Sequence, residues 1–172
     1  MHGIMKVVII GGGAAGMSAA SRIKRLNRDT EVIVFERTGM VSHAPCGIPY
    51  YLEGLFDNYE LFMHYTPDYF RRERGIDVRT NEAVVEVGWN YVVTDKGSKV
   101  EWDYLVLATG ASPVIPSIPI EGDHVFTIHH PADAVRLREI LESMSTVGII
   151  GTGYIGLEVA EAFRFRGKDV IM

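Results

Sequence analysis

Apolar and polar positions divide the first part of this chain into short strand-like and helix-like stretches. The runs Lys6–Ile10 and Glu31–Phe35 are apolar and rich in β-branched residues, which predicts buried parallel strands. The alanine-rich stretch between them follows a glycine cluster and has helical character through Leu26. The order strand, glycine turn, helix and strand predicts the start of a Rossmann-like α/β domain.

The middle of the chain predicts a further helix and several strands. Thr66 suits the N-cap of a helix that runs to about Arg74, and Gly75 suits its C-terminal end. A parallel strand, an antiparallel β-meander and a return to the buried sheet are expected at Ile76–Arg79, Ala83–Val87, Tyr91–Thr94, Val100–Trp102 and Tyr104–Leu107.

The same order of elements begins a second time near the end of the chain. A proline-rich connector leads to a predicted helix over 131–143, a strand over 147–150, a second glycine cluster, a helix to Arg166 and a strand from Asp169. Because a half-built sheet leaves an open edge, we infer that the chain is a fragment of a longer protein. The predicted division is a first domain at 1–112, a linker at 113–130 and the start of a second domain at 131–172.

Composition narrows the class of protein. The chain is 47% hydrophobic and 23% charged, which is typical of a soluble globular protein, and its net charge of -5 argues against nucleic acid as a main partner. No apolar run approaches the ~20 residues of a membrane helix, and the N-terminus does not resemble a signal peptide, so a cytoplasmic protein without a membrane partner is expected. Cys46 is the single cysteine, which excludes a disulfide scaffold, and no Cys/His spacing predicts a metal site.

The first glycine cluster has the spacing of a dinucleotide-binding turn. Gly11, Gly13 and Gly16 fill the GxGxxG positions, which permit a tight turn, approach of a pyrophosphate to the backbone and close packing of helix on strand. Glu36 follows at the end of the second strand, where a carboxylate can accept hydrogen bonds from ribose hydroxyls. A glycine turn without a ligand is the alternative, and the surrounding strands and the acidic residue argue against it.

Gly151, Gly153 and Gly156 repeat this spacing in the second cluster. The sequence ends before the position of the corresponding acidic residue, so it does not distinguish NADH from NADPH. We expect the parent protein to bind this second dinucleotide, and the fragment alone to bind it less readily. Two such sites joined by a linker indicate a flavin together with a nicotinamide.

Four segments carry a resemblance to a known family: VVIIGGGAAGMSAASRIKRL, SHAPCGIPY, LATGASPVIPSIP and VGIIGTGYIGLEVAEAF. They resemble the FAD-dependent pyridine nucleotide-disulfide oxidoreductases, and more narrowly the coenzyme A disulfide reductases, many of which are labelled NADH oxidases. The resemblance implies a Rossmann-like FAD-binding domain, with a parallel sheet and an antiparallel β-meander, followed by an incomplete second Rossmann domain for NADH or NADPH.

Two departures from neighbouring subfamilies sharpen the resemblance. Relatives of the glutathione reductase type carry two redox cysteines, and this chain has only Cys46. NADH peroxidases and water-forming NADH oxidases carry a histidine in the first glycine loop, where this chain has Ala14. Ala14 and Ser42 together match the coenzyme A disulfide reductase pattern.

The resemblance places Cys46 beside the flavin as the redox-active residue. Hydride would pass from the nicotinamide to the flavin, which would then reduce a mixed disulfide between Cys46 and coenzyme A. A helix is expected to begin near Cys46, and its N-terminus would favour the thiolate. The alternative is a buried structural cysteine. Ser42, which matches the serine of the family, either hydrogen-bonds near the sulfur or caps a turn.

Further residues match binding positions of the family. Coenzyme A carries three phosphate groups, and the resemblance implies that cations and a tyrosine receive it, although arginines on a solvated face are the plain alternative. These substrate-binding candidates are Arg22, Arg25, Tyr65 and Arg74, with Ser42 beside the thiol. Additional cofactor-binding candidates are Ala14, Ala15, Arg37, Val84, Ala108, Thr109 and Gly110 for FAD, and Tyr154, Ile155 and Glu158 for the nicotinamide dinucleotide. His129 and His130 are interpreted as surface residues.

The resemblance thus predicts that the parent is a homodimeric flavoprotein that reduces coenzyme A disulfide, or a related persulfide or disulfide, with NAD(P)H. Its dimerisation domain would be C-terminal and absent from this chain. One alternative is an FAD-binding module or an inactive fragment without turnover. A second is an NADH oxidase or sulfur reductase that uses coenzyme A as a fixed thiol.

Overall fold

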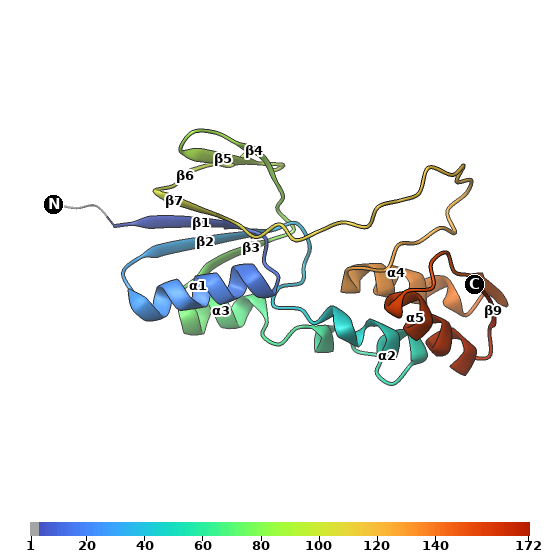
Figure 1. The fold of residues 1–172 in the computed structure, drawn as a ribbon. Coiled ribbons are helices and arrows are strands. Elements are labelled where there is room, and N and C mark those ends of the chain that lie inside the picture. The colour runs from blue at the N-terminus through green and yellow to red at the C-terminus, as the bar shows by residue number, and fades with distance from the viewer. Residues whose placement is uncertain (1–3) are drawn as a thin grey trace. The chain divides into compact units, whose positions relative to one another are not determined.

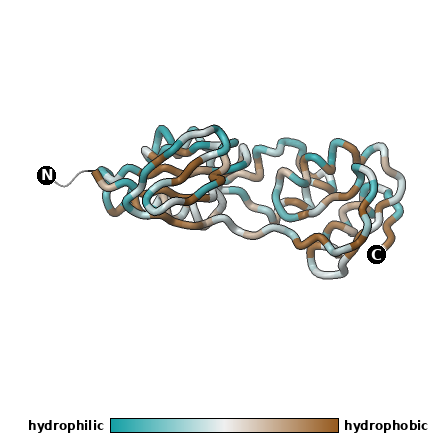
Figure 2. The backbone as a smooth tube through the Cα atoms, turned by 90° about the horizontal axis from the view of Figure 1, so that it is seen from above, coloured by the Kyte–Doolittle hydropathy of each residue, from teal (hydrophilic) through white to brown (hydrophobic). Residues whose placement is uncertain are grey.

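The computed structural model describes residues 4–172, which form two compact units. The first unit consists of residues up to 43 together with 63–111. The second consists of 44–62 together with 112–172. Residues 44–62, which contain Cys46, therefore group with the C-terminal part of the chain. Hydrophobic segments gather inside each unit (Figure 2).

A parallel sheet forms the centre of the first unit. Its strand order is β3-β2-β1-β7, and each strand runs parallel to its neighbours. These strands are β1 (Lys6–Ile10), β2 (Glu31–Glu36), β3 (Asp77–Thr80) and β7 (Tyr104–Leu107). Val8, Ile9 and Val34 are fully buried, which explains the continuous apolar runs in the sequence. The predicted Rossmann-like sheet is confirmed.

Helices cover one face of this sheet and a β-meander covers the other (Figure 1). Helices α1 (Ala14–Leu26) and α3 (Pro67–Arg74) pack through Met17, Ala20 and Phe70 on one face. The antiparallel strands of the meander pack through Val92, Val100 and Trp102 on the other face. These strands are β4 (Val84–Val87), β5 (Tyr91–Thr94) and β6 (Lys99–Glu101).

Local capping determines the limits of α3. The Thr66 side chain accepts a hydrogen bond from the Tyr69 backbone N–H at 3.2 Å, so the predicted N-cap is confirmed. Gly75 ends the helix in the left-handed conformation, with φ of 62°. The short range of these contacts explains why the sequence predicts both ends correctly.

The second unit combines the start of a parallel sheet with helices from two parts of the chain. Strands β8 (Thr146–Gly148) and β9 (Asp169–Ile171) run parallel. The helical elements are η1 (Pro45–Gly47), α2 (Ile48–Glu53), η2 (Tyr59–Phe62), α4 (Pro131–Leu141) and α5 (Tyr154–Phe165), where η denotes a 3₁₀ turn. A common hydrophobic core joins α2 and η2 to α4 and α5.

His130 differs from its interpretation as a surface residue. Its ring is half-buried, and Nδ1 accepts a hydrogen bond from the Ala132 backbone N–H at 3.1 Å. Asp133 accepts a hydrogen bond from the His130 N–H at 2.9 Å, which completes a capping box at the start of α4. The surface interpretation is therefore wrong for His130, whereas His129 is exposed.

None of the helices found among residues 4–172 is long and apolar enough to cross a membrane.

Candidate functional site

The first glycine loop is packed closely on its own unit. Gly11 has φ of +107°, and its N–H donates to the Phe35 carbonyl at 2.8 Å. A Cβ atom at Gly11 would lie 2.1 Å from the Ala108 carbonyl oxygen, and one at Gly16 would lie 1.8 Å from the Gly11 carbonyl oxygen. Both positions therefore require glycine, Gly11 for its conformation and close contact, Gly16 for the contact of α1 with the loop.

Gly12 is a necessary part of the loop that the sequence reasoning missed. A Cβ atom there would lie 2.8 Å from Val41 Cγ1 and 3.0 Å from Glu36 Cβ. Its N–H donates to Glu36 Oε2 at 2.8 Å. The run of consecutive glycines from Gly11 to Gly13 was the available signal, since the GxGxxG spacing alone does not require the middle residue.

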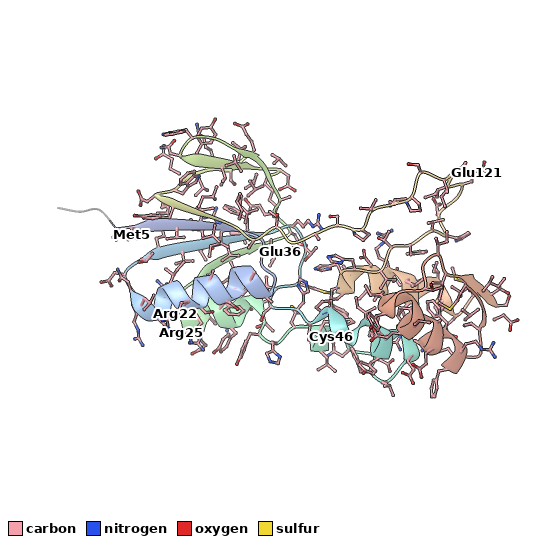
Figure 3. The ribbon with its side chains drawn as sticks, in the orientation of Figure 1. Met5, Arg22, Arg25, Glu36, Cys46 and Glu121 are labelled. Atoms are coloured by element: carbon pink, nitrogen blue, oxygen red, sulfur yellow. The ribbon has the colours of Figure 1, made fainter. Side chains whose placement is uncertain are left out.

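Glu36 is held rigidly beside this loop. It is only 7% exposed, and its second carboxylate oxygen, Oε1, accepts hydrogen bonds from the Thr38 N–H at 2.8 Å and the Thr38 hydroxyl at 2.9 Å. Figure 3 labels Glu36 within the first unit. A carboxylate offers about four acceptor positions, and the Gly12 N–H and the two Thr38 groups occupy three of them, so Oε2 retains one position for a ribose hydroxyl. The buried acid therefore fits the dinucleotide that the sequence predicts.

A second buried carboxylate adjoins Glu36. The Glu82 N–H donates to the Glu36 carbonyl at 3.0 Å, and Glu82 is 8% exposed. Its Oε1 has no hydrogen-bond partner among residues 4–172. The sequence gave no reason to single out Glu82, because its burial depends on the packing of the segment between β3 and β4.

Ser42 is tied to the first glycine loop through its backbone. It has φ of 49°, its N–H donates to the Gly12 carbonyl at 2.8 Å, and its carbonyl accepts from the His64 N–H at 3.1 Å. A Cβ at Gly13 would lie 3.7 Å from His43 Cε1, so His43 adjoins the start of α1. Ser42 belongs to the first unit and Cys46 to the second. The proposed contact of the Ser42 hydroxyl with the sulfur stays a prediction.

The remaining flavin-binding candidates follow β2 and β7 or stand at the start of α1 and β4. The Ala108 N–H donates to the Ile10 carbonyl at 2.8 Å, which brings the end of β7 beside the end of β1. Gly110 has φ of +68°, and Val84 is half-buried in the core between the sheet and the meander. Arg37 and Thr109 are exposed, as are Ala14 and Ala15 at the start of α1.

Basic and aromatic side chains gather on the helices of the first unit. The rings of Tyr65 and Tyr69 stack with centroids 4.5 Å apart, and Arg74 Nε donates to the Tyr69 hydroxyl at 3.2 Å. Arg22 and Arg25 are exposed on α1, which packs beside α3 on the same face of the sheet (Figure 3). The structure thus leaves the four candidates accessible on one covering layer of the unit.

Cys46 lies in the 3₁₀ turn that immediately precedes α2, so the predicted helix start is confirmed. The Ala44 N–H donates to the Phe62 carbonyl at 2.9 Å, and the Gly47 N–H donates to the Ala44 carbonyl at 3.2 Å. The cysteine is exposed, which excludes the alternative of a buried structural thiol.

A hollow of about 420 Å³ opens beside Cys46 within the second unit. Ala44, Gly47, Leu61 and the aromatic residues Tyr50, Phe56 and Phe62 form its walls, together with Glu158 from α5. The redox candidate and one candidate of the second glycine motif therefore face the same space. The sequence proposed roles for both residues but could not place them together.

The second glycine loop repeats the turn of the first without its surroundings. Gly151 has φ of +112°, and a Cβ at Gly156 would lie 2.1 Å from the Gly151 carbonyl oxygen. A Cβ at Gly151 or Gly153 would meet no described heavy atom within 4 Å. Tyr154 and Ile155 are 89% and 55% exposed.

Within residues 4–172, no three side chains of His, Cys, Asp or Glu come together as a metal site.

A family comparison covers almost the whole chain. Residues 5–172 match the family described as pyridine nucleotide-disulphide oxidoreductase. An NAD(P)H sulfur oxidoreductase (CoA-dependent) of Pyrococcus abyssi is 56% identical over 96% of this chain and 38% of its own length. A coenzyme A disulfide reductase of Staphylococcus haemolyticus is 30% identical over 97% of this chain and 40% of its own length.

A solved structure agrees with these relatives. The NAD-dependent persulfide reductase from A. fulgidus is 36% identical to this chain, with a TM-score of 0.90 over 96% of this chain and 33% of that one. The chain spans about two fifths of the length of the two curated relatives. The similarity therefore includes both glycine loops and Cys46 but leaves most of each relative unmatched.

Proposed function

This chain belongs to the pyridine nucleotide-disulphide oxidoreductase family, and we propose that it is the nucleotide-binding and thiol-bearing part of a flavoprotein. That enzyme would use NADH or NADPH to reduce coenzyme A disulfide or a related persulfide or polysulfide through Cys46. The observation that carries the proposal is the exposed Cys46 thiol in a hollow that also receives Glu158 from the second nucleotide helix.

FAD fits the first loop on the evidence of its own residues. Gly11, Gly12 and Gly16 allow the tight loop because side chains there would collide with the protein, and the backbone N–H groups at the start of α1 would receive the pyrophosphate. Glu36 would accept a hydrogen bond from the ribose, while Val84 and Ala108–Gly110 would line the cofactor. When bound, FAD supplies the transfer of two electrons from the nicotinamide to sulfur.

The second loop would hold NADH or NADPH. Gly151, Gly153 and Gly156 provide the turn, and the free backbone N–H groups at the start of α5 would receive the pyrophosphate. Tyr154, Ile155 and Glu158 would lie beside the dinucleotide. Exposure of Tyr154 and Ile155 agrees with this role, because residues that touch a ligand must be accessible in its absence.

Coenzyme A fits the covering helices of the first unit. Arg22, Arg25 and Arg74 would neutralise its phosphate groups, and Arg74 is already oriented by the Tyr69 hydroxyl. The exposed ring of Tyr65 would offer a flat apolar surface. The two curated relatives reported above carry the coenzyme in their names, which supports the same assignment here.

Cys46 would act by thiol–disulfide exchange. Its thiolate attacks one sulfur of coenzyme A disulfide, a Cys46–coenzyme A disulfide forms, and one coenzyme A thiolate leaves. Two electrons, which originate from NAD(P)H, then cleave this mixed disulfide and restore both thiols after protonation. This chain has no second cysteine, and the exchanging partner in this proposal comes from the substrate.

A second candidate function uses the same residues with coenzyme A as a fixed thiol. The similarity to a protein named NAD(P)H sulfur oxidoreductase (CoA-dependent) supports a sulfur species as the acceptor, whereas Ala14 argues against peroxide chemistry at the first loop. We further expect a cytoplasmic homodimer without nucleic-acid or membrane partners. The competing hypothesis is a module that binds FAD but does not catalyse a reaction.

Replacement of Cys46 by serine tests the proposal in the longer enzyme that contains this segment. We expect loss of NAD(P)H-dependent reduction of coenzyme A disulfide, while the yellow flavin absorbance is kept, because serine cannot form the mixed disulfide. Mass spectrometry of the wild type should find coenzyme A on Cys46 before reduction. Full activity of the serine variant would refute the role of Cys46, and a colourless wild type would refute FAD binding.

A further inference from the structure

The Cys46 segment shares its core with the second glycine-loop unit. Ile48 and Leu52 of α2 are buried against residues of α4 and α5, among them Leu137 and Phe163. Leu52 is fully buried and Phe163 is 2% exposed. Burial of large apolar side chains of this kind stabilises the contact of α2 with α4 and α5. The short helix that follows Cys46 therefore derives its stability from this unit.

Arg138 of α4 adds polar contacts at the far end of α2. Its Nη1 donates to the Phe56 carbonyl at 2.7 Å, and its Nη2 forms an ion pair with Asp57. The guanidinium also stands over the Tyr51 ring, 4.4 Å from the centroid. The Arg138 side chain is only 18% exposed, so its bond to the Phe56 carbonyl is partly shielded from water, whereas the Asp57 side chain is 87% exposed and its ion pair is screened like a surface pair.

Arg166, which follows α5, makes a weaker contact with the same loop. Its Nη1 lies 3.5 Å from the Glu53 carbonyl oxygen, and its Nη2 pairs with Glu142. A Cβ at Gly54 would lie 2.6 Å from Arg166 Nη1, so glycine at this turn makes room for the guanidinium. Two arginines from the C-terminal part of the chain thus hold the loop after α2.

The contact between Arg138 and Phe56 reaches the hollow beside Cys46. The Phe56 ring lines that hollow, and it packs against Tyr51 and Phe62 with ring centroids 5.4 Å away in both cases. The carbonyl that Arg138 holds belongs to the same residue. Movement of Phe56 would change both the wall of the hollow and the support of α2.

We propose that Arg138 is a positioning residue for Cys46. It fixes Phe56 and α2 to the second glycine-loop unit, and so determines how the thiol meets a reactant in the hollow. The functional meaning of this role rests on the proposed redox activity of Cys46, but the positioning itself does not.

Alkylation of Cys46 tests the proposal directly, because the chain has no other thiol. The rate constant for iodoacetamide would be measured from about pH 5 to about pH 9, around the ordinary thiol titration at about 8.5. The variants are Arg138→Met, which keeps the apolar stem, and Arg138→Lys, which keeps the charge. Arg164→Met is the matched control, because its hydrogen bonds go to the Lys168 carbonyl and Asp169.

We expect Arg138→Met to change the rate constant of Cys46 alkylation by about tenfold, or to shift its pH profile by about one pH unit. A factor of about ten is equivalent to the loss of one charge-assisted hydrogen bond. Arg138→Lys should lie between it and the wild type, because lysine cannot donate to Phe56 and Asp57 in the same fork geometry. Arg164→Met should follow the wild-type profile at the same folded fraction.

A profile of Arg138→Met that overlays the wild type would overturn the proposal. If that variant does not fold, an unchanged profile for Arg138→Lys would do the same. A change shared by Arg164→Met would indicate general loosening of the unit and would also count against positioning. Altered alkylation combined with full activity of Cys46→Ser would support positioning and refute the redox function, which separates the two proposals.

Discussion

The two glycine loops have almost the same backbone but different surroundings. Gly11 and Gly151 have φ of +107° and +112°, and the third glycine of each motif approaches the first so closely that a Cβ would collide. A Cβ at Gly11 would also collide with the Ala108 carbonyl, whereas a Cβ at Gly151 would meet no described heavy atom within 4 Å. The turn therefore follows from local sequence, while its enclosure requires strands from distant parts of the chain.

The strands before the loops differ in the same way. Val8 and Ile9 of β1 are fully buried between β2 and β7, whereas β8 pairs with β9 and remains largely exposed. Glu36 fixes the first loop from the end of β2 through its hydrogen bond with the Gly12 N–H. The comparison teaches that the glycine motif specifies a turn, and that the neighbouring strands enclose it.

Alanine at the first glycine of each motif should give the largest contrast. Both substitutions place a side chain at positive φ, which costs about 1–2 kcal/mol. Gly11→Ala adds a collision with the Ala108 backbone, and overpacking of this kind costs about 1–3 kcal/mol more. Urea unfolding would measure the first effect by tryptophan fluorescence, because Trp89 and Trp102 both lie in the first unit.

The matched variant Gly151→Ala should leave that fluorescence transition unchanged. Its effect would be followed by hydrogen exchange in α4 and α5, where only the conformational cost is expected. Equal losses of stability in the two variants would contradict the difference in enclosure that the structure describes.

Removal of the Glu36 carboxylate should have the next largest effect. Glu36→Ala deprives the Gly12 and Thr38 N–H groups of their acceptor, and it removes the proposed partner of the ribose. We expect FAD affinity to fall by about tenfold to a hundredfold, since hydrogen bonds to charged groups contribute about 1.5–3 kcal/mol. Flavin titration by fluorescence quenching would measure the change.

Glu31→Ala is the control for this prediction, because Glu31 lies on the same strand and its ion pair with Lys6 is exposed. Its FAD affinity should remain within about twofold of the wild type, as expected of a surface pair. An affinity of Glu36→Ala equal to that of Glu31→Ala would remove Glu36 from the site.

The smallest predicted effect is a loss of stability at low pH that is confined to the second unit. The hydrogen bond and charge of Arg166 lower the pKa of Glu142 from its ordinary value of 4.5. A lowered pKa in the folded state gives a stabilisation that is present above about pH 4.5 and is lost as the pH falls through the folded value. The contribution is small because the carboxyl is exposed to solvent and screened.

Glu142→Gln should therefore reduce the loss of stability of the second unit below about pH 4.5 and leave the first unit unchanged. Hydrogen exchange of α4 and α5 at pH values on both sides would measure it. Glu139→Gln on the exposed face of α4 is the control, and an equal response of that variant would exclude a specific role of the Arg166–Glu142 pair.

Sequence reasoning succeeded where the deciding contacts are local. The Thr66 cap bonds within three residues, and the glycine spacing determines the contact between Gly16 and Gly11. The strands of the first sheet were predicted because fully buried strands read as continuous apolar runs. The exact ends of strands were predicted less well, since β8 of the second unit spans Thr146–Gly148 where the sequence predicted 147–150.

The rest depends on contacts between residues far apart in the chain. Arg138 meets Phe56 across 82 positions, and nothing in the pattern around either residue indicates that pairing. Residues 44–62 follow the first glycine loop in sequence, yet they pack with 112–172. The position of Glu158 beside the hollow and the burial of Glu82 arise in the same way, from packing that a single sequence does not encode in any local signal.

The division of the second unit into two segments has a consequence for synthesis of the protein. Residues 44–62 leave the ribosome well before α4, which begins at Pro131. At about 5–20 residues per second, the delay before α4 has been made is on the order of ten seconds. Throughout that interval Ile48, Leu52 and Phe62 lack their native partners in α4 and α5, and the thiol of Cys46 is borne on a segment without these contacts. Oxidants and chaperones in the cell would meet this stretch of the nascent chain before its fold can protect it.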